Sequence, residues 1–268
     1  MIMNYLKYFE DYKLKPHNNY DERITIYSEK LIKKLKTNKI FNSDLIIDEN
    51  INLKTLYNIE SVIGNVMITD NNTLKDLGNL NYIKYNLLIM NNKLLKSLNK
   101  LKSTIYLDLI NVNIETLGDL TNVFDIKFTN TKIKSLGKIE KIKNNIKLIS
   151  NPDLIDTGEL KEVTNRFYIE NSGIKTLNKL EYVYDLLHIN KCMDLKDLGN
   201  LIYTKELRIN KNDKLKSLYP LKTIDTELLL IDTNIEDISS LEYVKRIYLT
   251  KNTKIPKEQY KKFDYRII

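Results

Sequence analysis

A short apolar pattern recurs along this chain at a nearly constant interval. It consists of an apolar residue, any residue and a second apolar residue, and successive patterns start 19 to 21 residues apart. The starts are Leu45, Val66, Leu87, Leu107, Ile126, Ile146, Phe167, Leu187, Leu207, Leu228 and Ile247. Since a unit of about 20 residues cannot bury its apolar side alone, the pattern predicts a solenoid of about eleven stacked coils around one continuous core.

The unit that begins at Leu207 is typical of the others. Leu207 and Ile209 alternate as in a short strand with one buried face. Leu215, Leu218 and Leu221 then follow at intervals of three, which suits a 3₁₀-like or irregular return better than a strand or a long α-helix. Stacked coils of this kind are expected to form a parallel sheet.

Each return carries a Ser, Thr or Asp just before its second leucine or isoleucine. The ten residues are Thr55, Asp76, Ser97, Thr116, Ser135, Asp156, Thr176, Asp197, Ser217 and Asp237. Short side-chain oxygens accept hydrogen bonds from nearby backbone N–H groups and start turns. We therefore interpret this position as a structural requirement of every coil and not as a row of catalytic hydroxyls.

Asparagine recurs at the sixth position of the longer units, for example at Asn71, Asn92 and Asn212. Its side-chain amide is expected to satisfy backbone groups where the chain leaves the sheet. In one unit the same position holds Cys192, which we predict to be a buried and unreactive thiol.

These units resemble leucine-rich repeats, L-x-x-L-x-L-x-x-N/C-x-L. Cys192 fits the N/C alternation of that family, and the Leu-Gly-x-Leu pieces at 77–80, 117–120 and 198–201 are similar to the short internalin-like and receptor-L-domain-like repeats. The resemblance covers about 45–255, although the longer units hold one extra residue before the leucine. It implies an α/β leucine-rich repeat solenoid with a parallel sheet on its concave face and 3₁₀ or irregular returns on its convex side.

A second resemblance concerns the origin of the chain. Its Asn-, Lys- and Ile-rich composition and the Leu-Lys-Tyr-Phe-Glu stretch at 6–10 are similar to proteins encoded by tailed phages or other AT-rich viral genomes.

Both ends are expected to cap the solenoid. Residues 1–44 are interpreted as an N-terminal arm and helical cap, 45–246 as the solenoid, and 247–268 as the last strand with a C-terminal cap. An amphipathic helix is predicted over 21–36, with Asp21 as its N-cap. Its apolar residues are Ile24, Tyr27, Leu31 and Leu35. At the other end, a short helix after Pro256 is expected to carry Tyr260 and Phe263.

The basic excess lies mostly in these ends. The formal net charge of the chain is +8, of which +3 lies in 1–44 and +4 in 247–268, while the long middle is nearly neutral at +1. A high net positive charge favours anionic partners such as nucleic acid or a membrane surface. Because most of this positive charge lies in the two terminal segments, we attribute it to the caps, and nucleic acid is not the favoured partner.

Several classes of function lack their sequence features. One Cys and two His provide too few ligands for a structural zinc site, and no cofactor or metal is expected. No G-x-S-x-G, Walker, H-E-x-x-H or Cys-x-x-Cys motif occurs, so the chain is not expected to be an enzyme. No apolar run of membrane-spanning length or secretory leader is recognised. We therefore expect a cytoplasmic protein (of the host cell if phage-encoded), or a virion component.

The leucine-rich-repeat resemblance implies that the second and fourth positions of each unit point outward on the concave face. Apolar residues cluster there near both ends, around Met90 and around Leu229, with polar residues between. Such patches are typical of partner surfaces, although apolar residues also stabilise sheets and a terminal segment could cover them. The candidate partner-binding residues are Met67, Leu88, Met90, Ile110, Lys127, Ile149, Tyr168, His188, Arg208, Leu229, Ile231 and Tyr248.

A row of lysines follows the last leucine or isoleucine of the loops: Lys54, Lys75, Lys96, Lys134, Lys175, Lys196 and Lys216. It is interrupted by Glu115, Ile155 and Glu236. The row is either an edge that binds anions or a solvated edge that nearby carboxylates neutralise.

Together these features favour a non-enzymatic scaffold that binds a protein partner on the concave face. The alternatives are a structural component of a virion or another assembly and, less favoured, nucleic-acid binding through the lysine row and basic ends. No small-molecule substrate or membrane partner is expected.

Overall fold

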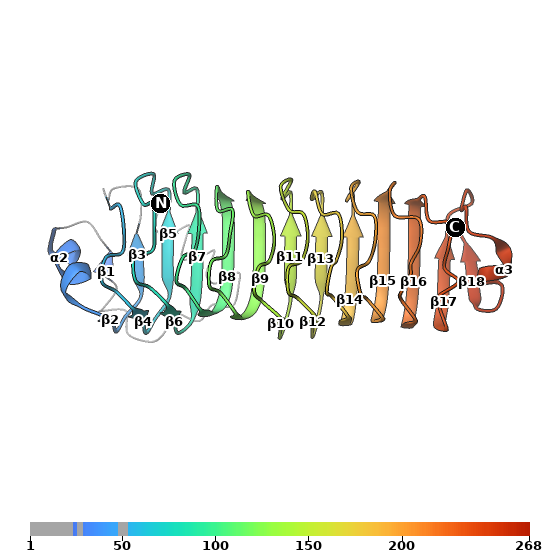
Figure 1. Ribbon diagram of the computed structural model, residues 1–268, viewed down its shortest axis with the longest axis horizontal. Helices are drawn as coiled ribbons and strands as arrows, with labels where there is room; N and C mark the ends of the chain where they lie inside the picture. The colour runs from blue at the N-terminus through green and yellow to red at the C-terminus, as the bar shows by residue number, and fades with distance from the viewer. Residues whose placement is uncertain (1–23, 26–28, 48–52) are drawn as a thin grey trace.

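The computed structural model describes residues 24–25, 29–47 and 53–268. The chain forms a parallel β-solenoid of about eleven coils, stacked along one long axis into an elongated rod (Figure 1). This confirms the predicted solenoid and its parallel strands. Helix is confined to two short segments of the described chain, so the α/β expectation is wrong in its helical part.

All eleven predicted strand starts lie in one ladder, which we call the main ladder. Leu45 pairs with Val66, and the in-register pairing continues coil by coil to Ile247. The strands are β3 (Leu45–Ile47), β5 (Val66–Thr69), β7 (Asn86–Met90), β8 (Ser103–Val112), β9 (Asn122–Thr131), β11 (Ile146–Ile149), β13 (Phe167–Glu170), β14 (Tyr182–Asn190), β15 (Tyr203–Asn212), β16 (Thr223–Thr233) and β17 (Tyr243–Leu249).

A second parallel ladder, which the sequence pattern did not predict, lies in the returns. Its separate strands are β2 (Ile40–Phe41), β4 (Ser61–Val62), β6 (Tyr82–Ile83), β10 (Lys141–Ile142) and β12 (Glu162–Val163). In the remaining coils the first residues of β8, β9 and β14 to β17 continue it. Of the two alternatives expected for the returns, 3₁₀ or irregular, the 3₁₀ form does not occur in the described residues, where the returns consist of turns, bridges and short strands.

Two residues between the ladders keep them in one strand, whereas three either break the strand or shift its register. Thr104 and Leu107 are buried with two exposed residues between them, and β8 runs through both positions. Ile142 and Ile146 have three residues between them, and there the chain breaks into β10 and β11. With the same spacing, β14 stays continuous only through a register shift after Val183. An extra residue in a strand leaves one position unpaired, which bends or interrupts it.

The N-terminal helix is shorter than predicted. Helix α2 spans Glu29–Thr37, whereas Ile24–Thr25 form strand β1, which pairs with Leu45–Ile46 of β3. Two consecutive β-branched residues favour a strand over the start of a helix. Leu35 of α2 is fully buried in the core. Residues 1–23, with the expected arm and Asp21, and Tyr27 lie outside the described residues.

The C-terminal end holds the expected helix and one unpredicted strand. Helix α3 spans Lys257–Tyr260 after Pro256, so it carries Tyr260 but ends before Phe263, and both rings pack against the core. Strand β18 (Asp264–Ile267) then pairs in parallel with β17, where Tyr265 lies opposite Ile247. The main ladder therefore continues one strand beyond the last predicted one.

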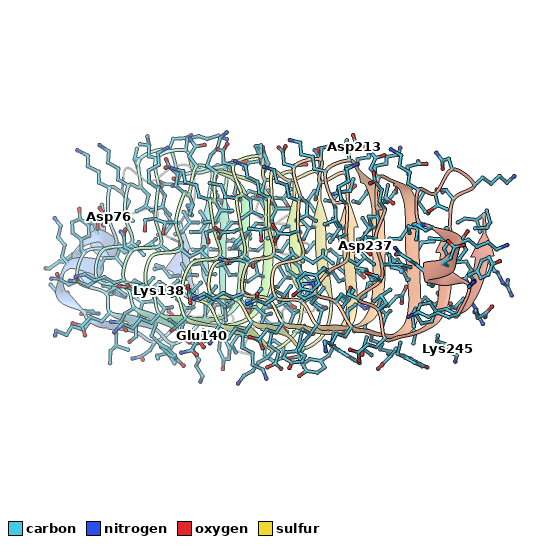
Figure 2. All side chains as sticks on the ribbon, turned by 45° about the vertical axis from the view of Figure 1, so that its right-hand side comes forward. Asp76, Lys138, Glu140, Asp213, Asp237 and Lys245 are labelled. Carbon is cyan, nitrogen blue, oxygen red and sulfur yellow. The ribbon has the colours of Figure 1, made fainter. Side chains whose placement is uncertain are left out.

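The Ser/Thr/Asp position works as predicted from the sequence. In all ten returns its side-chain oxygen accepts a hydrogen bond from the backbone N–H two residues later, for example from Gly78 to Asp76 at 2.8 Å. Hydroxyls also donate to the carboxylate of the next coil, as Ser217 does to Asp237 at 2.8 Å. Asp76 and Asp237 lie towards opposite ends of this row (Figure 2).

Two asparagine rows close the C-terminal ends of the main strands. The predicted one is buried: Asn92 Oδ1 accepts from the Leu95 N–H, and its amide donates to the Asn71 carbonyl. The second row lies one residue earlier, where Asn91 and Asn111 have φ values of 54° and 52°. Asparagine tolerates this left-handed conformation better than most residues, and Asn91 and Asn111 also bond to each other at 3.1 Å.

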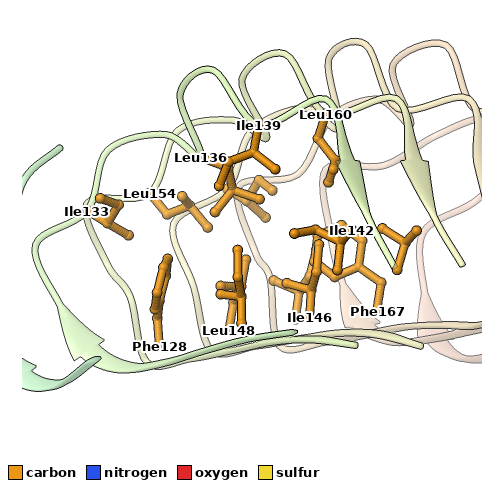
Figure 3. Close-up of a cluster of buried hydrophobic side chains, with 14 of the residues drawn as sticks. Phe128, Ile133, Leu136, Ile139, Ile142, Ile146, Leu148, Leu154, Leu160 and Phe167 are labelled. Atoms are coloured by element: carbon orange, nitrogen blue, oxygen red, sulfur yellow. The ribbon is translucent and has the colours of Figure 1, made fainter. Parts of the chain in front are cut away.

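Apolar side chains from the ladders and returns fill one continuous core. Phe128, Leu148 and Phe167 extend from successive main strands, and Leu136 and Leu160 face them from the returns (Figure 3). Each coil buries its apolar side against the coils on either side, which is the physical basis of repeat stacking.

Candidate functional site

The outward side chains of the main ladder form two rows, which together we call the main face. Cross-strand pairing places the predicted candidates in these rows as expected. The first row is Met67, Leu88, Asp108, Lys127, Lys147, Tyr168, His188, Arg208, Leu229 and Tyr248. The second is Thr69, Met90, Ile110, Thr129, Ile149, Glu170, Asn190, Asn210 and Ile231.

The N-terminal end of the main face is closed. Met67 keeps 7%, Leu88 3% and Thr69 1% of its surface exposed. These side chains point away from the core, so both faces of β5 and much of β7 are buried. Met67 and Leu88 are therefore not accessible surface, and the open part of the face begins at Met90, which is half-buried.

A mostly buried ion pair lies on β8 and β9, near the N-terminal end of the open part. Lys127 Nζ lies 3.6 Å from a carboxylate oxygen of Asp108 on the neighbouring strand, and both side chains are mostly buried. Burial and the charge of Lys147 lower the pKa of Lys127 to about 8. Removing a cation from water disfavours its charged form, so this ammonium is far easier to deprotonate than an exposed lysine.

Aromatic and polar groups continue the face across the next coils. The rings of Tyr168 and His188 lie 5.8 Å apart, and the Asn190 amide donates to Glu170 at 3.0 Å. Burial, followed by the charge of Arg208, lowers the pKa of His188. His188 has the Tyr168 ring beside it and no hydrogen-bonded carboxylate among the described residues.

A charge network holds the C-terminal end. Arg246 contacts Glu227 at 3.4 Å and Asp264 at 3.1 Å, and it donates to the Tyr248 hydroxyl at 3.2 Å. These bonds raise the pKa of Arg246 further above its already high value. The network fixes Tyr248 beside half-buried Leu229, its partner in the ladder.

The lysine row lies on an exposed edge, where backbone hydrogen bonds join neighbouring coils, such as that from the Lys75 N–H to the Lys54 carbonyl at 2.9 Å. Three of its seven members form ion pairs with the glutamates that interrupt it. Lys96 and Lys134 both pair with Glu115, at 3.5 and 2.9 Å, and Lys216 pairs with Glu236 at 3.3 Å. The unpaired members within the described chain are Lys54, Lys75, Lys175 and Lys196. The edge is thus neutralised in part, as the solvated-edge alternative expects.

Cys192 occupies the asparagine position, fully buried, and its burial raises the thiol pKa to about 11. Its Sγ lies 3.7 Å from the Ile169 carbonyl, in the place where the Asn151 amide donates to Phe128. Within the described residues, no three His, Cys, Asp or Glu side chains gather as a metal-binding group would require.

Sequence reasoning missed an apolar surface on the edge formed by the short-strand ladder. Five large apolar side chains in four successive coils keep 36–39% of their surface exposed, and we call them the edge strip: Ile63, Tyr82, Ile105, Tyr106 and Phe124. Each lies next to, or two residues from, a buried residue of the short-strand ladder. Since these returns were predicted to be irregular, no outward position was assigned to them.

Comparisons with protein-family models, curated proteins and solved structures give no match to this chain. The resemblances to leucine-rich repeats and to phage-encoded proteins therefore stay predictions. In the part of the chain that the structure describes, both helices are too short to cross a bilayer.

Proposed function

We propose that this chain is a non-enzymatic scaffold whose open main face binds a partner protein. The observation that carries the proposal is the composition of that face. Apolar side chains such as Met90, Ile110 and Ile149 lie half-buried on the outer side of a rigid sheet, next to charges already fixed by ion pairs. Exposed apolar residues in such a setting favour protein contacts.

The length of the face and its internal ion pairs support this function. From β7 to β17 the open rows extend over about 40 Å, at about 4.8 Å per strand. Because Lys127 and Arg246 are already held by neighbouring carboxylates, a partner would not have to order them on binding. Interfaces that are ordered in advance lose less entropy on association.

Within this proposal the coils are of the leucine-rich-repeat type, curved so that the main face is concave, and α2 caps the first coil. Buried Asn92 and Cys192 in the N/C position and Leu35 of α2 in the core support it. Partial neutralisation of the lysine row gives no reason to prefer nucleic acid as the partner.

The test compares matched variants in affinity capture from cells that produce the protein. Met90→Asp and Ile231→Asp place a charge on the two apolar parts of the main face. Met193→Asp makes the same change on an exposed methionine of a return. We expect a reproducibly captured protein to be lost with both main-face variants and kept with Met193→Asp. Equal capture by all three, with folding intact by circular dichroism, would exclude the main face as the site.

A further inference from the structure

The edge strip borders a groove on the outside of three successive coils. The groove encloses about 430 Å³, and exposed Ile105 and Phe124 supply its apolar wall. The rings of Tyr106 and Phe124 touch edge to face, with centroids 6.2 Å apart, so the wall continues into the strip. The other lining residues are Ser103, Thr104, Thr121, Asn122, Val123, Lys138, Glu140, Lys141 and Lys143.

The cationic part of the groove comes from the coil that follows Phe124. Lys138 and Glu140, labelled in Figure 2, lie on that coil. Lys138 pairs with Asp119 at 2.7 Å, and Glu140 pairs with Lys161 at 3.1 Å. Lys141 likewise has a carboxylate partner, Glu162 at 2.6 Å, so these three charges are compensated from outside the groove.

Lys143 is the exception. It is exposed, and no carboxylate of the described residues lies within ion-pair distance of it. The groove therefore presents one ammonium without a carboxylate partner, on the coil next to the one that carries Phe124. A complementary ligand carries an apolar group and a carboxylate close together.

We propose that the groove and edge strip bind a linear acidic segment of a partner protein. An aromatic or aliphatic side chain of that segment would pack onto the surface formed by Ile105 and Phe124, and an adjacent Asp or Glu would pair with Lys143. Apolar neighbours in the segment would continue along the strip towards Tyr82. This site lies at the short-strand ladder, before the main-face positions of the same coils, and its proposal does not depend on the one made for the main face.

A peptide fits these walls better than the other occupants. A nucleic acid would leave the strip's aliphatic residues, Ile63 and Ile105, without apolar contacts, and it is bound mainly through phosphates by several cations. A neutral glycan would leave Lys143 unpaired. Binding of a second copy of the chain to this surface would appear as self-association, which is one outcome of the experiment below.

The probe is a displayed library of random peptides, selected on the immobilised full chain. We expect enriched sequences to combine aromatic or aliphatic residues with Asp or Glu. Affinity of one enriched peptide, measured by fluorescence polarisation, should fall about tenfold with Phe124→Ser and with Lys143→Glu. Matched controls outside the groove, Ile155→Ser and Lys175→Glu, should leave it unchanged.

Four results would overturn the proposal. These are no enrichment, enrichment of basic peptides, equal affinity for wild type and groove variants, and self-association of the wild type that Phe124→Ser abolishes. The last would assign the surface to a second copy. Both groove substitutions replace exposed side chains, so folding should persist. If the melting curve of Phe124→Ser shifts, Ile105→Ser tests the same wall.

Discussion

The buried asparagine row makes a quantitative prediction about stability. The Asn92 side chain accepts hydrogen bonds from the N–H groups of Leu94 and Leu95, at 3.2 and 2.8 Å, and donates to the Asn71 carbonyl at 2.6 Å. In Asn92→Ala the buried Leu95 N–H and Asn71 carbonyl lose this partner. Each unsatisfied buried group costs about 1–3 kcal/mol, so we expect a loss of about 2–6 kcal/mol in the free energy of unfolding.

Urea denaturation followed by circular dichroism measures the loss, with Asn72→Ala as the control. Asn72 is exposed and makes one bond of 3.5 Å, so its removal should cost less than about 0.5 kcal/mol. Since each coil contacts only its neighbours, hydrogen exchange in Asn92→Ala should accelerate mainly near residues 71–95. A loss no larger than that of Asn72→Ala would refute the assigned role of the buried row.

Three further predictions follow from individual residues. Gly158 and Gly137 have similar positive φ values, 64° and 65°, but of the two only Gly158 would place an added Cβ 2.5 Å from a backbone oxygen. Gly158→Ala should therefore destabilise the chain by about 1–3 kcal/mol more than Gly137→Ala in the same assay. Equal losses would contradict the predicted steric clash. Because the pKa of Lys127 is lowered to about 8 in the folded chain, the unfolded chain binds this proton more tightly. The free energy of unfolding should therefore rise between pH 8 and 10.5. Lys127→Met should remove that rise from urea midpoints measured across this pH range. Cys192 is buried, and its thiol pKa is raised to about 11. It should therefore react with a disulfide reagent at mildly alkaline pH only after denaturant is added. Full labelling of the folded chain would contradict its burial.

The repeat period was sufficient to predict the main ladder because one alternating pattern returns in every coil. Leu45 and Ile247 mark its predicted ends, and all strand starts between them pair in register. The Ser/Thr/Asp and buried Asn positions were also predictable, since short polar side chains at fixed offsets have few roles in a tight turn.

The short-strand ladder was not predictable in the same way. Strands such as Ser61–Val62 contain one buried residue each, too few for an alternation to be recognised. The edge strip and the groove beside Phe124 were missed with it. At the N-terminal end, helical spacing over 21–36 favoured a helix, whereas the pairing of Ile24 with Leu45 places a strand there.

For the main face, sequence predicted which residues share a row but not which are accessible. Met67 and Leu88 have the same register as the open positions, and only their surroundings bury them. Likewise, the charge of Lys127 could be counted from the sequence, but its lowered pKa depends on burial and on Lys147 in the next coil. Accessibility and pKa are properties of packing between coils that no single repeat contains.

Side-chain oxidation with and without a captured partner tests the main-face proposal most directly. Hydroxyl radicals modify exposed methionine and tyrosine, and mass spectrometry locates each modification. The proposal predicts that a partner protects Met90, Tyr168 and Tyr248 on the main face, while Met193 on a return is oxidised equally with and without it. Protection of Met193, with unchanged oxidation of the three main-face residues, would contradict it.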